Sequence, residues 1–420
     1  MSAIACAARM MPRRPLLRPL LPGGRALSSA GECPTGMVDG MLEHVRNQCR
    51  GEPDRALDVL RMGAALELPP RDKARVLMAM AEVEADRAHW ADASDHAAQA
   101  LADSAGGLKQ ADRAWLARWH AGALLAQAGK ERDAQAAATL EALDATLLSE
   151  ESPQACMPVM LAAAGRAALA TVCAEGDGAE LRALLGRTPP PSSLFTPELR
   201  AAWPGLADLA LVHLACGRTE EATELLKAAG SSAAEAGGHE ALCPLLSPAH
   251  FQENAADVAL LRAQVALRAR DWEAAEPLLS EALKAAEAVG SESHPRVGLV
   301  LTLLGQCYAH SARPTLAEGL YRSAAQMLHL GDRSRTPPVH ASAAALVSWR
   351  YAQMLTAMPK RGHEADEWAE RARAAWGAAA APVEEVLGSL DVLKGTGTHG
   401  SGALVHLQTR RLVLCSAASA

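Results

Sequence analysis

The segment His294–Leu330, HPRVGLVLTLLGQCYAHSARPTLAEGLYRSAAQMLHL, decides how the rest of the chain is interpreted. Small residues let two antiparallel helices approach closely, while larger side chains fill the gaps inside and between helical hairpins. Residues of both kinds recur here at fixed distances, so the segment predicts a pair of packed helices. Counted from Gly305, they are Tyr308 at +3, Ala317 at +12, Tyr321 at +16 and Ala324 at +19.

This spacing resembles that of the tetratricopeptide repeat (TPR). The opening ESHPRVGLVLTLLGQCY, from Glu292 to Tyr308, resembles in particular the longer repeats of kinesin light chains and related bacterial regulators. In this comparison His294 and Pro295 cap the start of the first helix. The resemblance implies an α-solenoid, in which successive helical hairpins stack on their neighbours.

The same spacing recurs along the chain. We call the residue that corresponds to Gly305 in each repeat its first-helix anchor. Successive anchors lie 37 to 53 residues apart, which exceeds the roughly 34 residues of a standard repeat, so we expect each helix to be longer by about one turn. The prediction is an all-α domain over residues 37–380, a right-handed α-solenoid of about eight TPR-like hairpins. The first-helix anchors are His44, Ala81, Gly122, Ala167, Ala210, Ala263, Gly305 and Ser348.

Composition supports a folded helical chain. Half of the residues are hydrophobic and 21% are charged, and the abundant alanine favours helices that pack closely. No stretch alternates polar and apolar residues long enough to demand a sheet. The nine cysteines form no C-x-x-C pair, which favours buried thiols in a reducing compartment. No run of 18 apolar residues occurs, so no transmembrane segment is predicted.

Residues 1–27 contain five arginines and no acidic residue, which is the composition of an organellar transit peptide. Arg25-Ala26-Leu27-Ser28 resembles a matrix-processing pattern and predicts cleavage after Leu27, with residues 28–36 as a linker. We therefore expect a mitochondrial protein, in the matrix. Four prolines interrupt any amphipathic helix in the leader, which leaves the chloroplast, or an untargeted basic tail, as alternatives. Removal of the five arginines would take the net charge from −7 to −12.

The C-terminal part divides into three predicted segments. Residues 381–394 are expected to form a capping helix, with a further partial repeat as the alternative. Residues 395–403 are glycine-rich and predict a flexible linker; no Lys-Ser or Lys-Thr follows them, so a nucleotide-binding loop is disfavoured. Residues 404–420 form an apolar tail that could pack back on the array or add a strand to a partner.

The sequence shows no catalytic motif. H-E-x-x-H, G-x-S-x-G and Walker-type patterns are absent, and the histidines lack metal-ligand spacing. We therefore predict no catalytic residue, no metal site and no cofactor, and a chain that is not an enzyme. A site assembled from distant residues stays open as an alternative, as does a regulatory subunit of an enzyme complex.

The resemblance to TPR arrays implies that the first helices line a concave surface. Positions that face inward in the family form a mixed polar groove with two tryptophans, although either tryptophan could instead belong to the core. Such a face suits an extended peptide or a helix of a protein partner. The predicted partner-binding residues are Arg75, Glu82, Trp119, Gln264, Arg268, Gln306, His310 and Trp349, with Asp86, Gln127, Asp257 and Gln353 beside them.

The clamp that chaperone-binding TPR domains use for a C-terminal carboxylate is absent, because its Lys and Asn positions carry other residues here. These are Met78, Ala79 and Glu82 in one repeat, and Thr302, Leu303 and Gln306 in another. The sequence thus predicts a non-catalytic scaffold or assembly adaptor for protein partners, of undefined oligomeric state. An organellar RNA-binding repeat protein is the alternative, disfavoured by the acidic mature chain and by the irregular repeat length.

Overall fold

The computed structural model describes residues 36–49, 52–103, 107–127, 129–147, 163–173, 203–234, 248–289, 294–330, 337–377, 381–400 and 402–415. The predicted transit peptide over residues 1–27 lies outside this part of the chain. So does the predicted linker, apart from Gly36. The second helix of the repeat anchored at Ala167 also lies outside it.

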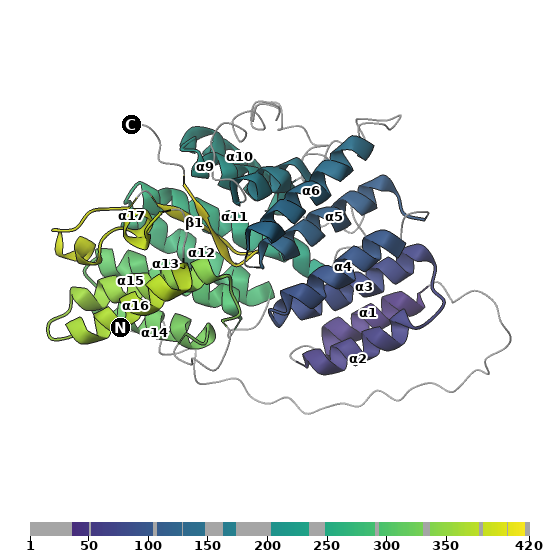
Figure 1. The fold of residues 1–420 in the computed structure, drawn as a ribbon, viewed down its shortest axis with the longest axis horizontal. Coiled ribbons are helices and arrows are strands. Elements are labelled where there is room, and N and C mark those ends of the chain that lie inside the picture. Colours follow the sequence, from purple (N-terminus) through teal and green to yellow (C-terminus); the bar gives the residue numbers. More distant parts are fainter. Residues whose placement is uncertain are drawn as a thin grey trace. The chain divides into compact units, whose positions relative to one another are not determined.

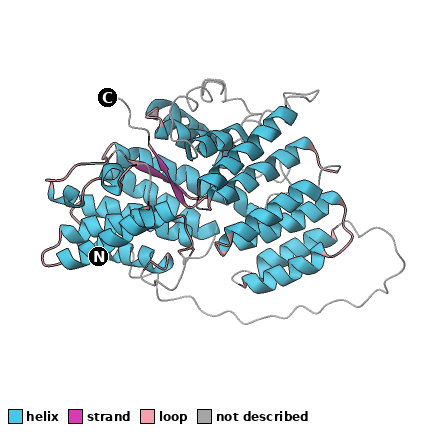
Figure 2. Cartoon of the chain, in the orientation of Figure 1, coloured by secondary structure: helices cyan, strands magenta, loops and turns pink. Residues whose placement is uncertain are grey.

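Consecutive helices pack as adjacent pairs, and they dominate the fold in Figures 1 and 2. The predicted all-α helical repeat is confirmed, and each of the eight anchors lies in a helix that opens a pair or, for Ala167, in the helix over 163–173. The pairs are α1 (Met37–Gln48) with α2 (Pro53–Ala64), α3 (Pro70–Asp86) with α4 (Trp90–Asp103), α5 (Gln110–Leu125) with α6 (Lys130–Leu147), α9 (Trp203–Ala215) with α10 (Thr219–Ala234), α11 (Pro248–Arg268) with α12 (Trp272–Val289), α13 (Pro295–His310) with α14 (Pro314–Met327), and α15 (Ala341–Thr356) with α16 (Gly362–Trp376).

The pair α13 and α14 shows why the spacing works. The His294 side chain accepts a hydrogen bond from the backbone N–H of Arg296 at 3.2 Å, which caps α13 as expected. At Gly305 the helices touch so closely that an added Cβ would lie 3.1 Å from the Tyr321 ring. Ala317 is fully buried opposite. The small residues are therefore the places where the two helices meet.

The first pair corrects the predicted register. His44, the first-helix anchor of the first repeat and therefore expected at a helix contact, is exposed. The buried face of α1 is instead Val38, Leu42 and Val45, which recur every three or four residues as an amphipathic helix requires. The pattern match there was wrong because it placed the polar face of α1 inward.

The C-terminal segment differs most from expectation. The predicted capping helix is broken at Gly388, which has a positive φ of 84°, into α17 (Val383–Leu387) and the 3-10 helix η4 (Leu390–Lys394). The predicted flexible linker packs on α17: the Gly402 N–H donates to the Val386 carbonyl at 2.9 Å, and a Cβ at Gly400 would collide with the same carbonyl. Glycine is required there by close backbone approach.

The tail then forms an antiparallel hairpin of two strands, β1 (Ala403–His406) and β2 (Arg411–Leu414). The sequence did not predict these strands, because the tail has no alternating pattern of polar and apolar residues. Of the two fates considered for the tail, packing back on the array is the one observed. The pair Leu404 and Val413 joins one hydrophobic cluster, and the pair Val405 and Leu412 joins the other. The hairpin is therefore buried on both faces.

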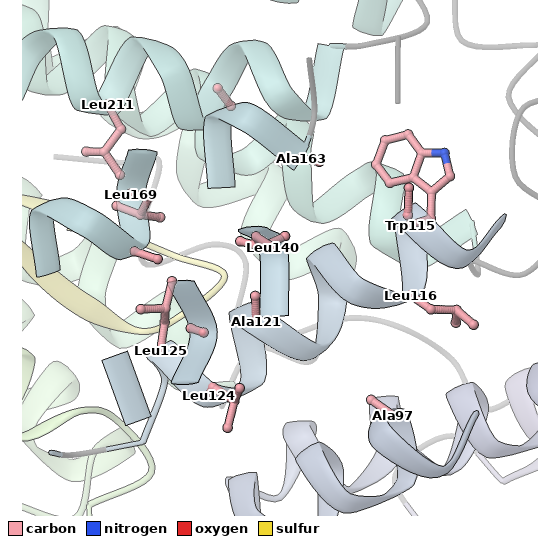
Figure 3. Packing of buried hydrophobic residues seen from close by; sticks show 14 of the residues in the cluster. Ala97, Trp115, Leu116, Ala121, Leu124, Leu125, Leu140, Ala163, Leu169 and Leu211 are labelled. Carbon is pink, nitrogen blue, oxygen red and sulfur yellow. The ribbon is translucent and has the colours of Figure 1, made fainter. Parts of the chain in front are cut away.

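The two clusters form the core of the array. Figure 3 shows part of the N-terminal one, in which Trp115 and Leu124 of α5 share a cluster with Leu140 of α6 and Leu169 of the helix over 163–173. Helix α11 contributes to both clusters, through Leu261 to one and through neighbouring positions to the other. Within the described residues, no helix combines the length and apolar character needed to cross a bilayer.

Candidate functional site

The groove formed by the first helices holds the chain's own hairpin. The Gln264 side chain in α11 donates to the Val405 carbonyl at 3.0 Å and accepts from the Val405 N–H at 2.7 Å. About two turns earlier in the same helix, Asp257 accepts from the Leu407 N–H at 2.8 Å. These side chains satisfy backbone groups that a strand edge would otherwise leave unpaired. The hairpin is thus recognised through its backbone, as a bound peptide would be.

Arginines at the tip and in β2 anchor the hairpin to distant helices. Arg411 pairs with Asp133 of α6 at 2.6 Å and donates to the Leu125 carbonyl at 2.8 Å. The Arg410 guanidinium lies over the Trp90 ring, 4.8 Å from its centre, where a cation is attracted by the aromatic face. Both arginines are buried. They tie the C-terminal segment to α4, α5 and α6.

Beneath the hairpin lies a buried charged cluster centred on Asp208 in α9. Arg118 and Arg166 donate to its carboxylate at 2.7 and 3.0 Å, and Nε2 of His406 lies 3.4 Å from it. Burial alone would raise the pKa of Asp208, but the two arginines outweigh burial and hold the pKa below its usual value. The cluster is therefore an ionised network that fixes β1 in place.

His406 also bonds Thr409 through Nδ1 at 2.7 Å, so a hydroxyl, an imidazole and Asp208 stand in a row. Nucleophilic catalysis uses these three groups in this order. Here Thr409 and Asp208 are 0% exposed and His406 is 1% exposed, so a substrate has no approach to the hydroxyl. The three residues instead hold the hairpin turn against α9.

Two predicted partner-binding residues are covered by this segment. Gln264 is occupied by Val405, and Trp349 is fully buried with its indole N–H donating to the Gly388 carbonyl at 2.8 Å. Gln353 beside it donates to the Ser389 carbonyl at 2.9 Å. The expectation that these side chains face an open groove was wrong, because the C-terminal segment fills that part of the groove. For Trp349 the core alternative is correct.

Two other predicted residues line a small cavity of about 70 Å³ near the first half of the array. Glu82 of α3 and Trp119 of α5 face it together with Asp86, Arg296 of α13 and Gln408 of the hairpin turn. Arg75 lines neither this cavity nor the larger one described next. It pairs with Asp72 at 3.4 Å and with Asp39 of α1. The structure therefore separates Arg75 from the other candidates.

The larger cavity, about 230 Å³, brings together four of the predicted residues: Gln264, Arg268, Gln306 and His310. The His310 ring stacks on Trp272 with 4.2 Å between ring centres and 2° between planes. Burial, followed by the positive charges of Arg350 and His399, lowers the pKa of His310 to about 4. His310 is therefore a neutral, oriented imidazole at pH 7.

Three basic residues of this cavity were missed by the sequence prediction: Arg270, Arg350 and His399. The inward positions carried over from the family fell on Trp349 and Gln353, which flank Arg350 in α15. A signal was present, because Arg350 is the only charged residue of α15. His399 gave no such signal, since it lies in a glycine-rich segment interpreted as a linker.

Among the described residues, Glu84, His89 and Asp92 place ligand atoms within 4.8 Å of one another, as a metal site would. Nδ1 of His89 lies 2.9 Å from the Glu84 carboxylate, and Arg87 lies 3.7 Å from the same carboxylate. His89 and Asp92 are exposed. Glu84 thus has cationic and histidine partners within the protein, which accounts for the grouping as an ion-pair cluster.

Comparison with known proteins agrees with this architecture in the second half of the chain. The family model of the tetratricopeptide repeat matches residues 254–328, which run from α11 through α14. No curated protein matches the chain. One solved structure that does match is described as the crystal structure of BtubC (BKLC) from P. vanneervenii. The two share 14% identity, over 82% of this chain and 94% of that chain, with a TM-score of 0.34. The family match shows tetratricopeptide repeats in residues 254–328, within a chain whose described helices pack in consecutive pairs.

Proposed function

We propose that this chain is a non-catalytic interaction scaffold or assembly adaptor of mitochondria that binds a peptide or helix of a partner protein. TPR repeats indicate a protein–protein interaction scaffold in general. The observation that carries the finer proposal is that Arg268, Gln306 and His310 line a cavity on adjacent first helices, within the segment that matches the family. Polar groups in a concave site suit a specific partner.

The hairpin limits where a partner can lie. It already uses Gln264 and Asp257, so the partner meets the groove beyond Val405, at the ends of α11 and α13. The cavity holding Glu82 and Trp119 is a second contact of smaller volume. We therefore expect the proposed partner to bind at one or both ends of the region that the hairpin covers.

Proximity labelling from the native protein identifies the partner, and pull-down then tests the surface. The double variant Arg268→Ala, His310→Ala should lose the partner, whereas Glu273→Lys, on the outer face of α12 where Glu273 is exposed, should retain it. Melting curves confirm that both variants are folded. Equal loss from both, or from neither, shows that binding uses another surface.

The mitochondrial assignment rests on the acid-free, arginine-rich leader and its processing pattern. We expect the mature protein recovered from isolated mitochondria to begin at Ser28 or within a few residues of it. N-terminal sequencing of that fraction measures this. An intact Met1 in a cytosolic fraction contradicts the assignment, and recovery from chloroplasts supports the alternative compartment.

A further inference from the structure

The larger cavity is lined by cationic and imidazole side chains without a balancing acid. We define the basic pocket by Arg268, Arg270, His310, Arg350 and His399. They come from the end of α11, the end of α13, the middle of α15 and the glycine-rich segment before β1. No described residue that lines the pocket is an aspartate or a glutamate. The pocket therefore holds the positive charges of three arginines beside two imidazoles, with no acidic side chain among its described lining residues.

The arginines are held by neutral acceptors. Arg350 is half-buried; it donates to the Leu387 carbonyl at 3.0 Å and to the Gln353 side chain at 2.8 Å, while its buried Nε lacks a hydrogen-bond partner within the described structure. Arg268 donates to the Leu214 carbonyl at 3.2 Å and contacts the Cys415 sulfur at 2.7 Å. Neutral acceptors orient these guanidinium groups, and no acidic side chain among the described lining residues balances their charge.

Helix ends explain only part of this arrangement. Arg268 and His310 are the last residues of α11 and α13, where the helix dipole places about half a negative charge and favours cations. Arg350 lies in the middle of α15, and His399 lies outside any helix. Burial and the charges of Arg270 and Arg350 lower the pKa of His399, as expected where positive groups crowd together. A bound anion would reduce the electrostatic repulsion among these positive groups.

Size and shape restrict the anion. The cavity of about 230 Å³ is smaller than the roughly 300–1,000 Å³ of sites for drug-sized ligands, yet it exceeds the roughly 30 Å³ that one water occupies. β1 closes one side through Leu404 and Val405. Guanidinium groups match the oxygens of a phosphate with paired hydrogen bonds. We propose that the basic pocket binds a compact phosphate group, either as free phosphate or as the ester of a small molecule.

Binding is measured by calorimetry and by melting curves with inorganic phosphate and with glycerol phosphate, against potassium chloride at equal ionic strength. The full chain should bind one phosphate group saturably. Arg350→Gln and Arg270→Gln should each weaken binding about tenfold or more, the loss of one charge-assisted hydrogen bond. Arg262→Gln is the matched control, since Arg262 lies on α11 outside the pocket and pairs with Glu281 at 3.6 Å.

Binding of either phosphate compound supports the proposal, and their relative affinities identify the source. If Arg350→Gln fails to fold, Arg270→Gln and His399→Gln carry the test, because Arg270 and His399 are exposed. An effect equal to that of chloride, or equal weakening by Arg262→Gln, overturns it. The inference does not rest on the proposed protein partner, because the ligand is a small anion and the assay contains no partner protein.

Discussion

At the scale of single residues, the contact between α13 and α14 is the feature that the sequence predicts best. Gly305, Ala317 and Tyr321 occupy the expected positions, and the small residues lie where the helices meet. This succeeds because helix packing at short separation is a local property, decided by the volumes of side chains within one hairpin.

Ala317→Trp tests that contact. Overpacking a core position costs typically about 1–3 kcal/mol, and an indole at a fully buried alanine should reach the upper end of that range or exceed it. Urea unfolding and circular dichroism measure the loss. Ala274→Trp is the control, because Ala274 lies exposed on α12. Unchanged stability of Ala317→Trp would show that the helices do not meet at this residue.

The groove residues show where sequence reasoning stops. Gln264, Arg268, Gln306 and His310, which the family positions put along one surface, all line one cavity. The family positions do not show that Gln264 is already bonded to Val405, which follows it by 141 residues. No local sequence pattern encodes a contact over that separation. The sequence therefore could not predict that the C-terminal hairpin covers this part of the groove.

At the scale of elements, the hairpin was missed for a physical reason. A strand with one face in water alternates polar and apolar residues, whereas a strand buried on both faces reads as a continuous apolar run. β1 and β2 are of the second kind, since successive residues enter different hydrophobic clusters. Their polar residues, His406 and Arg411, are buried with partners, so they did not mark a solvent-facing side.

Arg411→Gln tests how firmly β2 is anchored. The change leaves Asp133, which is 4% exposed, without its cation, and breaking one partner of a buried pair costs about 3–5 kcal/mol. Arg55→Gln removes one partner of an exposed pair with Glu52 and should cost less than about 1 kcal/mol. Urea unfolding compares the two. Similar small losses from both changes would mean that the Arg411 pair is not buried in solution.

At the scale of the whole molecule, several histidines make stability depend on pH. Burial is the main cause that lowers the pKa of His294 and His310 to about 4 and of His340 to about 3. Unfolded histidine has a pKa near 6.5, so the unfolded chain binds more protons between these values. Stability is therefore complete above about pH 6.5 and is lost as the pH falls toward 4.

His340→Asn isolates one of these contributions. His340 caps α15 by accepting from the Ser342 N–H at 3.1 Å, and asparagine is a favoured cap that does not titrate. We expect the variant to match the parent chain in melting temperature near pH 8 and to lose less stability on acidification to pH 4. Parallel pH profiles for the two proteins would show that His340 is protonated equally in the folded and unfolded states.

The hairpin also bears on how the array unfolds. Repeat proteins are stabilised mainly by neighbouring contacts, so distant hairpins of an array can unfold separately. Here β1 and β2 join both hydrophobic clusters, and only α11 among the helices named above is shown to do the same. Ending the chain after Gly402 removes that link while leaving α11 in place. We expect calorimetry to show a lower first melting transition and a higher ratio of calorimetric to van't Hoff enthalpy than in the full chain. Arg55→Gln in the full chain controls for a general loss of stability, and an unchanged ratio after truncation would mean that α11 alone couples the two clusters.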